Sequence, residues 1–507
     1  MHSRVWSATT VGIDAVPVEI ETDVRAGLPR HRVVGLPYGA VCESLDRIRS
    51  ALANSGLPAP RGVITINLAP ADLRKDSASL DLPIAIGVLA ALGRRVSASV
   101  VERSYILGEL ALDGSVRPVR GVLAMTLEAK SRGAKSVIVP VENGREAGVV
   151  NDIEVFAVAS LREALDAAAG DRQPSDVRTK SVGRSGAVVA GGLDLSDVSG
   201  QEQVKRALEI AAAGGHNMLL VGPPGAGKTM MARRLSTILP EMSVDEAVET
   251  TRIHSANGIL GSGSGLLRQR PFRAPHHTIS DAGLCGGGSN PRPGEISLAH
   301  NGVLFLDELP EFKRSVLEVL RQPLEDGVVR ISRSRISVQF PARFLLVASM
   351  NPCPCGHLAG GARECICRSS DILRYNARIS GPLLDRIDMH VPVRPVDFSR
   401  ISADGDRAGP TSPMIRARVA ASRAEQVRRA GTCNALLSPA AVRQVCRPGR
   451  EGLTMLRDAV DRLGLSARAF TRVLKVARTI ADLSESESVR PGDVAEAIQY
   501  RSWDRSW

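Results

Sequence analysis

A glycine-rich stretch at residues 222–229 has the composition and spacing of a phosphate-binding loop. It reads Gly-Pro-Pro-Gly-Ala-Gly-Lys-Thr, follows the apolar residues 217–221 and precedes a helical sequence that starts at Met230. Glycines allow backbone N–H groups to surround phosphates, and the N-terminus of the following helix adds a partial positive charge. We expect Lys228 to reach the β- and γ-phosphates of ATP and the Thr229 hydroxyl to bind Mg²⁺. The predicted nucleotide-contacting residues are Gly222, Pro223, Pro224, Gly225, Ala226, Gly227, Lys228 and Thr229.

Further polar positions supply the remaining chemistry of an ATPase. The apolar residues 303–306 end in Asp307 and Glu308, and the apolar residues 344–348 are followed by Asn351. We expect Asp307 to hold Mg²⁺ through water, Glu308 to polarise the attacking water and Asn351 to orient that water. A chance glycine-rich turn would explain the loop alone, and a solvent-facing acidic strand end would explain Asp307 and Glu308 alone. The loop, the two acids and Asn351, occurring together and in this order, predict Mg²⁺-dependent ATP hydrolysis.

Two arginines are candidates for stabilising charge on the transferred phosphoryl group. Arg386 follows a short helical stretch at 380–385 and would reach the γ-phosphate of a neighbouring subunit. Arg468 opens a helix near the C-terminus and would contact the same phosphate. Arginines are frequent in this chain, so position alone leaves a plain surface role equally open.

Hydrophobic patterning divides the 507 residues into three folded parts of an overall α/β protein. Residues 1–170 alternate β-rich runs with amphipathic helices. Residues 171–192 are polar, lack a hydrophobic period and predict a linker. Residues 193–400 contain short, wholly apolar runs that are typical of a parallel sheet covered by helices on both faces. After a polar hinge at 401–412, residues 413–507 predict a helical bundle that serves as a lid.

Particular elements follow from the same patterns. In the first part we expect strands at 11–24, 63–68 and 136–140 and helices at 40–55 and 82–92. In the last part we expect helices at 438–446, 453–463, 467–483 and 491–500.

Composition restricts the environment and the partners of the protein. The net charge is +11 with a pI of about 9.6, which favours a polyanion such as DNA as partner. Aromatic residues make up only 3%, which argues against a surface built on base stacking. No apolar run reaches eighteen residues and the N-terminus lacks the apolar core of a signal peptide. We therefore expect a cytoplasmic protein that does not enter membranes.

Four of the eight cysteines lie close together as Cys353, Cys355, Cys365 and Cys367. Four thiolates in one glycine-rich loop can close a tetrahedral Zn²⁺ site with no open position, which would be structural. The spacing is C-x-C where C-x-x-C is commoner, and the alternative is four reduced thiols in a mobile loop.

Two other polar stretches carry competing interpretations. His276 and His277 would form a metal pair, but adjacent histidines are expected to point apart, which favours a structural role. Residues 328–340 have the pattern of a β-hairpin with basic residues near its turn. Such a hairpin would grip a phosphate backbone without reading sequence, or would be a plain solvated hairpin. Its candidate DNA-binding residues are Arg330, Arg333 and Arg335.

Several longer motifs resemble those of the YifB/ComM family of magnesium-chelatase-like AAA+ ATPases, over essentially the whole chain. They are Arg-Ala-Pro-His-His at 273–277, Pro-Gly-Glu-Ile-Ser-Leu-Ala-His-Asn-Gly at 293–302, the 303–308 strand and Asn-Pro-Cys-Pro-Cys-Gly at 351–356. The resemblance implies that Asn351 is sensor 1, Arg386 the arginine finger and Arg468 sensor 2. It also implies a ring-shaped homo-hexamer whose sites are completed by the adjacent protomer, with residues 283–293 facing the central pore.

The N-terminal part resembles the proteolytic domain of Lon, an S5-type α+β fold. Residues 75–80, Lys-Asp-Ser-Ala-Ser-Leu, align with the Lon serine loop and place Ser79 at the nucleophile. A Ser–Lys dyad needs a lysine to take the serine proton. The corresponding position holds Leu123, and Lys130 and Lys135 lie elsewhere in the pattern. The resemblance therefore implies a peptidase-inactive domain that serves hexamer assembly or DNA contact.

Two hypotheses for function follow. In the first, the protein is a hexameric DNA translocase that acts on recombination intermediates, because ComM-type relatives are implicated in branch migration. In the second, it is a chelatase-type or protein-remodelling ATPase that acts on a protein partner. DNA-stimulated ATP turnover that falls with salt would separate them.

Overall fold

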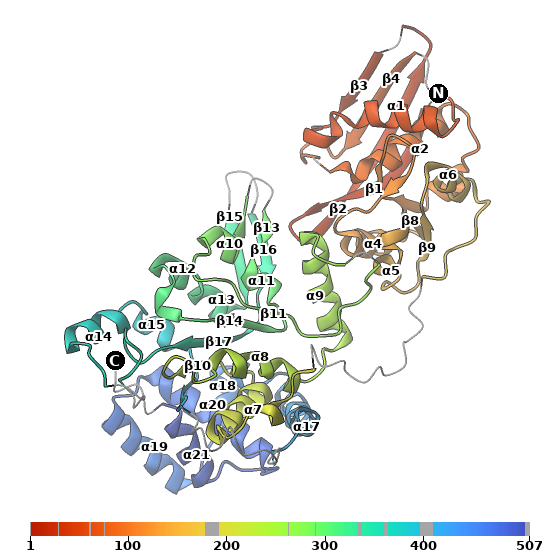
Figure 1. Ribbon diagram of the computed structural model, residues 1–507. Helices are drawn as coiled ribbons and strands as arrows, with labels where there is room; N and C mark the ends of the chain where they lie inside the picture. The colour runs from red at the N-terminus through yellow and green to blue at the C-terminus, as the bar shows by residue number, and fades with distance from the viewer. Residues whose placement is uncertain are drawn as a thin grey trace.

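The computed structural model describes residues 2–28, 30–59, 62–75, 77–177, 192–261, 263–288, 291–332, 337–358, 364–395 and 409–501. Within these ranges, three units follow one another along the molecule (Figure 1). An N-terminal α/β unit lies at one end, a central unit with a parallel sheet lies in the middle, and a helical unit lies at the other end. No helix in the described ranges combines the length and the apolar character that crossing a bilayer requires.

The N-terminal unit is built on a seven-stranded sheet of order β3-β4-β2-β1-β5-β8-β9. Its strands are β1 His2–Val11, β2 Asp14–Arg25, β3 Arg30–Val34, β4 Val63–Ala69, β5 Ser104–Ile106, β8 Ser136–Pro140 and β9 Glu154–Val158, with a separate small pair β6 Glu109–Leu110 and β7 Val116–Arg117. Its helices are α1 Ser44–Asn54, α2 Asp81–Ala91, α3 Ala98–Val101, α4 Val122–Ser131, α5 Gly144–Ala147 and α6 Leu161–Ala169. The sheet is antiparallel at β1–β2 and β2–β4 and parallel elsewhere.

The single strand expected at 11–24 is wrong in its boundaries. Strand character begins at His2, and a turn at Gly12 separates β1 from β2. Gly12 has φ +67°, a conformation that favours glycine. The expected linker also begins later than residue 171, because Ser175 donates its backbone N–H to Val155 of β9. Most of the remaining linker, residues 178–191, lies outside the described residues.

The central unit holds a five-stranded, wholly parallel sheet of order β11-β14-β17-β10-β18. Its strands are β10 Met218–Val221, β11 Phe272–Arg273, β14 Val303–Leu306, β17 Leu345–Met350 and β18 Met389–Pro392. Its helices are α7 Glu202–Gly214, α8 Lys228–Ile238, α9 Val244–Asn257, α10 Asp281–Cys285, α11 Glu295–Leu298, α12 Arg314–Val319, α13 Arg321–Asp326, α14 Ser369–Asn376 and α15 Gly381–Leu384. Every residue of β10, β14 and β17 is buried, as the apolar runs predicted.

Two hairpins project from this unit. One pairs β12 Gly286–Gly287 with β13 Arg292–Pro293, and the other pairs β15 Val328–Ser332 with β16 Ser337–Pro341. Both contact α11. The second hairpin confirms the pattern read at 328–340.

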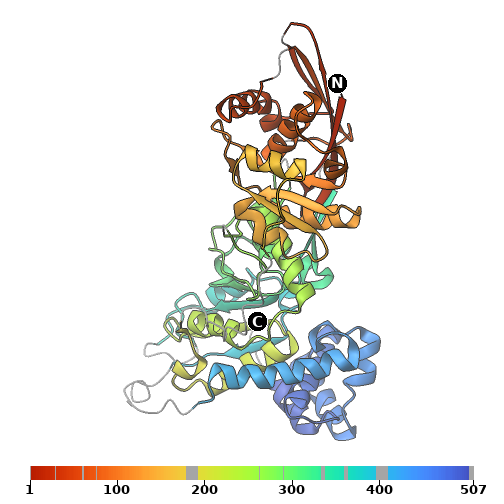
Figure 2. The ribbon, with the colours of Figure 1, turned by 90° about the vertical axis from the view of Figure 1, so that its right-hand side faces the viewer.

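The C-terminal unit consists of α17 Ser412–Ala430, α18 Pro439–Val445, α19 Arg450–Leu463, α20 Ala467–Leu483 and α21 Pro491–Gln499. Four of these agree with the expected helices, and α17 is the long helix that sequence patterning did not single out. Figure 2 shows α17 (light blue) running beside the yellow-green helices of the central unit, and α17 contacts both α7 and α8. Residues from both units share one hydrophobic core.

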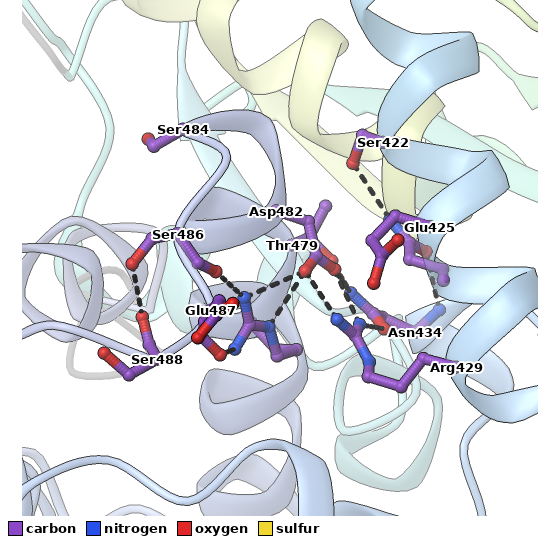
Figure 3. Close-up of polar contacts among 12 residues, drawn as sticks. Ser422, Glu425, Arg429, Asn434, Thr479, Asp482, Ser484, Ser486, Glu487 and Ser488 are labelled. Carbon is purple, nitrogen blue, oxygen red and sulfur yellow. Dashed lines mark hydrogen bonds and ion pairs between the residues drawn. The ribbon is translucent and has the colours of Figure 1, made fainter.

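A buried polar network fastens the helices of the C-terminal unit to one another (Figure 3). The Asp482 carboxylate accepts two hydrogen bonds of 2.8 Å from Arg429 and one of 3.0 Å from Arg478 Nε. Asn434 Nδ2 donates to the same carboxylate at 2.8 Å and to Thr479 at 3.0 Å. The network joins the C-terminal end of α20 to α17 and to the turn before α18.

A second buried carboxylate joins α20 to the central sheet. Asp388, just before β18, pairs with Arg472 of α20 and accepts the backbone N–H of Asn217 at 2.9 Å. Burial raises the pKa of Asp388, but Arg472, His216 and the Asn217 N–H outweigh burial and hold it below its ordinary value. The position of α20 relative to the sheet therefore depends on a charged Asp388.

The N-terminal unit docks onto the central unit through the β1–β2 turn. Ile13 belongs to the same hydrophobic cluster as Val338 and Phe340 of β16. A Cβ on Gly12 would stand 2.4 Å from Val338 Cγ1, so the turn packs directly on β16 of the second hairpin. The adjacent Asp14 forms an ion pair with Arg252 of α9.

Candidate nucleotide site

The phosphate-binding loop lies between β10 and α8, at the carboxyl end of the central sheet. Gly225 and Gly227 have φ +76° and +83°, which turns the chain sharply so that α8 begins at Lys228. A Cβ at Gly222 would stand 2.2 Å from the Val393 carbonyl oxygen, so only glycine fits there. Backbone N–H groups of such a loop and of the first turn of α8 suit phosphate oxygens.

The Lys228 ammonium is held inside this loop. It donates to the Gly222 and Pro223 carbonyls at 2.7 and 2.9 Å and to Asn351 Oδ1 at 3.0 Å. Burial lowers the pKa of Lys228, while Asp307 and Glu308 act in the opposite direction. The structure thus brings the predicted Lys228 and Asn351 into direct contact, although 123 residues separate them.

Thr229 and Asp307 meet at the end of β14. The Thr229 hydroxyl donates to Asp307 Oδ2 at 2.7 Å, and Ser349 Oγ donates to Asp307 Oδ1. A hydroxyl and a carboxylate at one point form an oxygen donor set that suits Mg²⁺. Sequence reasoning missed Ser349. Its contact with Asp307 follows from its position in β17, which lies directly beside β14.

Glu308 takes an unusual backbone conformation at the start of its turn. Its φ and ψ are both 53°, and its backbone N–H contacts Asp307 Oδ1 at 3.1 Å and Ser349 Oγ at 3.4 Å. The side chain is 58% exposed, and its Oε2 lies 3.8 Å from His277 Nδ1. A left-handed conformation is uncommon for glutamate and marks a residue placed by its surroundings.

Adjacent His276 and His277 do not point apart, contrary to the expectation. Their ring centroids lie 4.1 Å apart because the two residues sit in a turn and not in a strand. His276 Nδ1 lies 2.9 Å from the Thr278 hydroxyl, so its polar contact is local.

The predicted arginines form a second group around a residue that sequence reasoning missed. Arg386 is only 4% exposed and pairs with Glu325 of α13, while its Nη1 donates to the Pro382 carbonyl at 2.5 Å. Arg468 is 61% exposed, and its Nη2 lies 3.7 Å from the same Glu325. The Arg386 hydrogen bond lowers the pKa of Glu325. Arg386 and Arg468 are therefore neighbours, and their roles toward a γ-phosphate stay predictions.

The four predicted cysteines Cys353, Cys355, Cys365 and Cys367 come together, with all sulfurs within 4.8 Å of one another. Three Sγ–Sγ distances are 3.4, 3.6 and 3.7 Å. Tetrahedral Zn–S bonds of about 2.3 Å imply sulfur separations of about 3.8 Å, so the cluster fits zinc.

The cysteine loop packs against the phosphate-binding loop. Gly356 has φ +86°, and a Cβ there would stand 2.4 Å from Pro224 Cδ. Cys353 and Cys355 are joined to Asn351 by only one and three residues. A metal in this loop would therefore fix the position of residues that line the nucleotide site.

Of the three hairpin arginines, Arg330 lies in β15, opposite Gln339, and is exposed. Arg333 and Arg335 lie outside the described residues. The exposed Arg330 side chain lies outside the hydrophobic cluster to which Val329, Val338 and Phe340 of the hairpin belong.

In the N-terminal unit, the Ser79 side chain is 1% exposed and receives a hydrogen bond of 2.8 Å from Ser77. The nearby Lys75 is also buried, and its ammonium donates to the carbonyls of Gly35, Leu68 and Pro70. Leu123 lies fully buried in α4. Ser79 is thus buried and the Lys75 ammonium is bound by carbonyl oxygens, while the likeness to Lon and the absence of peptidase activity stay predictions.

Comparisons with known proteins agree with this arrangement. Residues 194–401 match the family described as magnesium chelatase, subunit ChlI; residues 20–143 match subunit ChlI of Mg-chelatase, and residues 409–501 match its C-terminal family. The chain is 44% identical to the Escherichia coli protein YifB and to the Haemophilus influenzae competence protein ComM, in each case over 99% of this chain and 97% of the relative. It is 28% identical to the magnesium-chelatase 38 kDa subunit of Rhodobacter capsulatus over 33% of this chain and 53% of that subunit.

Proposed function

Because the chain belongs to the YifB/ComM family of magnesium-chelatase-like AAA+ proteins, we propose that it is an ATP-hydrolysing motor that moves along DNA. The observation that carries the ATPase part is the convergence of Lys228, Thr229, Asp307 and Asn351 on one phosphate-binding loop. The motor acts as a homo-hexamer on branched or single-stranded DNA, in recombination or DNA uptake.

In this proposal, Lys228 exchanges its bonds to the loop carbonyls for oxygens of the β- and γ-phosphates. Glu308 accepts a proton from the attacking water as the water oxygen bonds to the γ-phosphorus, and the bond to the β-phosphate oxygen breaks. Asn351 orients that water. Thr229 and Asp307 would hold Mg²⁺, which neutralises charge on the phosphates when bound.

In the proposed hexamer, Arg386 and Arg468 contact the γ-phosphate of ATP bound to a neighbouring subunit. Their shared partner Glu325 lies in α13, whereas Lys228 contacts carbonyls of its own loop and Asn351. A γ-phosphate from the adjacent protomer would compete with Glu325 for both guanidinium groups. Two cations held together in this way suit the charge that develops during phosphoryl transfer.

DNA is supported as substrate by the charge of +11, by the exposed Arg330 of the projecting hairpin and by the name of the relative ComM as a competence protein. The second candidate is a chelatase-type ATPase that works on a protein partner, and it is supported by the three chelatase families that the chain matches.

The test measures ATP turnover with and without single-stranded, duplex and branched DNA, at several salt concentrations. We expect DNA to raise the rate, and the increase to fall as salt rises, because phosphate contacts release counterions. Arg330→Ala should weaken the stimulation, while Gln339→Ala, on the neighbouring strand, serves as the matched control. A rate indifferent to every DNA would reject the translocase and favour the protein partner.

A further inference from the structure

The backbone of Arg386 is held by a side chain of the C-terminal unit. Arg472 of α20 donates from Nη1 to the Arg386 carbonyl oxygen at 2.9 Å and pairs with the carboxylate of Asp388. Asn217, directly before β10, donates from Nδ2 to the same carbonyl at 3.2 Å and from its backbone N–H to Asp388 at 2.9 Å. The position of Arg386 is therefore fixed from two sides, by α20 and by the central sheet.

The helix α20 also carries Arg468, one turn before Arg472. Side chains one turn apart lie on the same side of a helix, one above the other. Arg468 is exposed, and its Nη2 lies 3.7 Å from Glu325, the residue that also pairs with Arg386. One helix thus presents one of the two predicted phosphate-binding arginines and anchors the backbone of the other.

The Arg386 guanidinium is enclosed in this structure. Its side chain is 5% exposed and contacts the Glu325 carboxylate and the Pro382 carbonyl. Its buried Nε has no hydrogen-bond partner among the described residues, which makes this position of the side chain costly. Arg386 therefore reaches a phosphate of another subunit only when its segment of the chain shifts, and the contacts of its backbone decide how that segment moves.

The Arg472 side chain can transmit a shift of α20 to this segment. The Arg472 and Asp388 side chains are 21% and 5% exposed, so water and salt compete little with their ion pair. The same Nη1 contacts the Arg386 carbonyl, so α20 cannot move away without breaking two polar contacts at once. Breaking a shielded ion pair on one side is costly, and residues 386–388 therefore move with α20.

We propose that Arg472 is a positioning residue that joins Arg386 to α20, so that Arg468 and Arg386 approach the γ-phosphate of a neighbouring subunit together. This inference rests on the proposed function, in which that phosphate belongs to ATP bound by the adjacent protomer. Arg472 does not touch the nucleotide. It acts on the neighbour's site through the position of Arg386, since a misplacement of about 1 Å can cost on the order of 100-fold in rate.

Mixed oligomers of the full-length protein separate this role from one confined to a subunit's own fold. Wild-type subunits are mixed with a roughly ninefold excess of Lys228→Ala subunits, which do not hydrolyse ATP but present their arginines to the next subunit of the ring. These added subunits carry Lys228→Ala alone, or combined with Arg472→Met or with Arg386→Ala. Lys228→Ala combined with Arg457→Met is the matched control, because Arg457 is exposed on α19. Phosphate release per wild-type subunit is measured, and mass photometry compares the size of the assemblies.

A further variant removes the effect of an unpaired buried charge. Arg472→Met alone leaves the Asp388 carboxylate without its cation, whereas Arg472→Met with Asp388→Asn replaces both partners and leaves no such charge. This combination takes the place of Arg472→Met if subunits with the single change do not assemble. Its affinity for a fluorescent ATP analogue should equal that of wild type, because Arg472 acts on the neighbour's site and not on its own.

We expect phosphate release by wild-type subunits to be at least about fivefold lower with the Arg472→Met addition than with Lys228→Ala alone, because about nine in ten wild-type sites then face an altered neighbour. The Arg386→Ala addition should have a similar effect, and the Arg457→Met addition none. If Arg386→Ala lowers phosphate release but Arg472→Met does not, the positioning role is overturned. If Arg386→Ala also has no effect, the neighbour-completed site of the proposed function is rejected, and the role of Arg472 with it.

Discussion

Replacing Asp482 by asparagine should loosen the C-terminal helical unit by a calculable amount. The Asp482 side chain is 1% exposed, and that of Arg478 is 2% exposed. Removing the carboxylate charge leaves Arg478 and Arg429 without their anion inside the protein. Breaking a buried ion pair on one side costs about 3–5 kcal/mol, and the lower figure of about 3 kcal/mol applies because asparagine keeps one acceptor oxygen. This corresponds to a roughly 150-fold larger population of the opened unit.

Hydrogen–deuterium exchange read by mass spectrometry measures this opening locally, which matters because a chain of three units does not unfold in one step. Amides of α20 and of the turn before α18 should exchange on the order of 100-fold faster in Asp482→Asn. Asp461→Asn, an exposed carboxylate on α19, is the control and should leave exchange unchanged. Equal exchange rates in wild type and Asp482→Asn would refute the reasoning, because they would mean that the buried ion pairs contribute nothing to the packing of α20.

Three further predictions follow from other contacts. Removing the zinc that we propose for the four-cysteine site should raise the KM for ATP several-fold, because Gly356 packs on Pro224. Elemental analysis for zinc before and after chelation, and turnover after Mg²⁺ is restored, test this. A KM that stays unchanged once all zinc is removed would contradict it. Gly12→Ala should strain a residue at φ +67° and push on Val338, so DNA-stimulated turnover should fall while unstimulated turnover stays within about twofold; equal loss of both would count against the docking role of this turn. Because the pKa of Asp388 is depressed in the folded protein, its charged form contributes stability above the ordinary pKa near 4, and this stability is lost as the pH falls below that value. The thermal unfolding temperature of the C-terminal unit should therefore fall steeply in acid for wild type and less steeply for Asp388→Asn. Parallel curves of unfolding temperature against pH would disprove the assignment.

The parts of the nucleotide site that the sequence predicted follow apolar strands: Asp307 and Asn351 come directly after β14 and β17, and Thr229 opens the helix that follows the loop after β10. Parallel strands end at the same edge of a sheet, so Thr229, Asp307 and Asn351 had to approach one another once the strands were recognised. The helices of the C-terminal unit followed likewise from their apolar spacing, with α20 found at its observed bounds. The cysteine cluster could be predicted because all four thiols lie in one short loop.

What escaped prediction depends on side chains that meet across distant elements. Glu325 pairs with both Arg386 and Arg468. It lies 61 residues from Arg386 in the sequence, and no feature of its own helix identifies it as a functional residue. The two histidines were expected to point apart, as adjacent side chains in a strand or loop do, but their rings lie 4.1 Å apart. The long helix α17 has a mixed, arginine-rich pattern, because parts of its surface pack on both α7 and α20.

The proposed function requires that Glu308 activates water for hydrolysis of ATP held by the loop at 222–229. The most direct measurement compares wild type with Glu308→Gln for both binding of a fluorescent ATP analogue and steady-state release of phosphate. We expect unchanged nucleotide affinity and a kcat that falls by about 100-fold or more, the usual effect of removing a general base. A Glu308→Gln variant that hydrolyses ATP at the wild-type rate would contradict it.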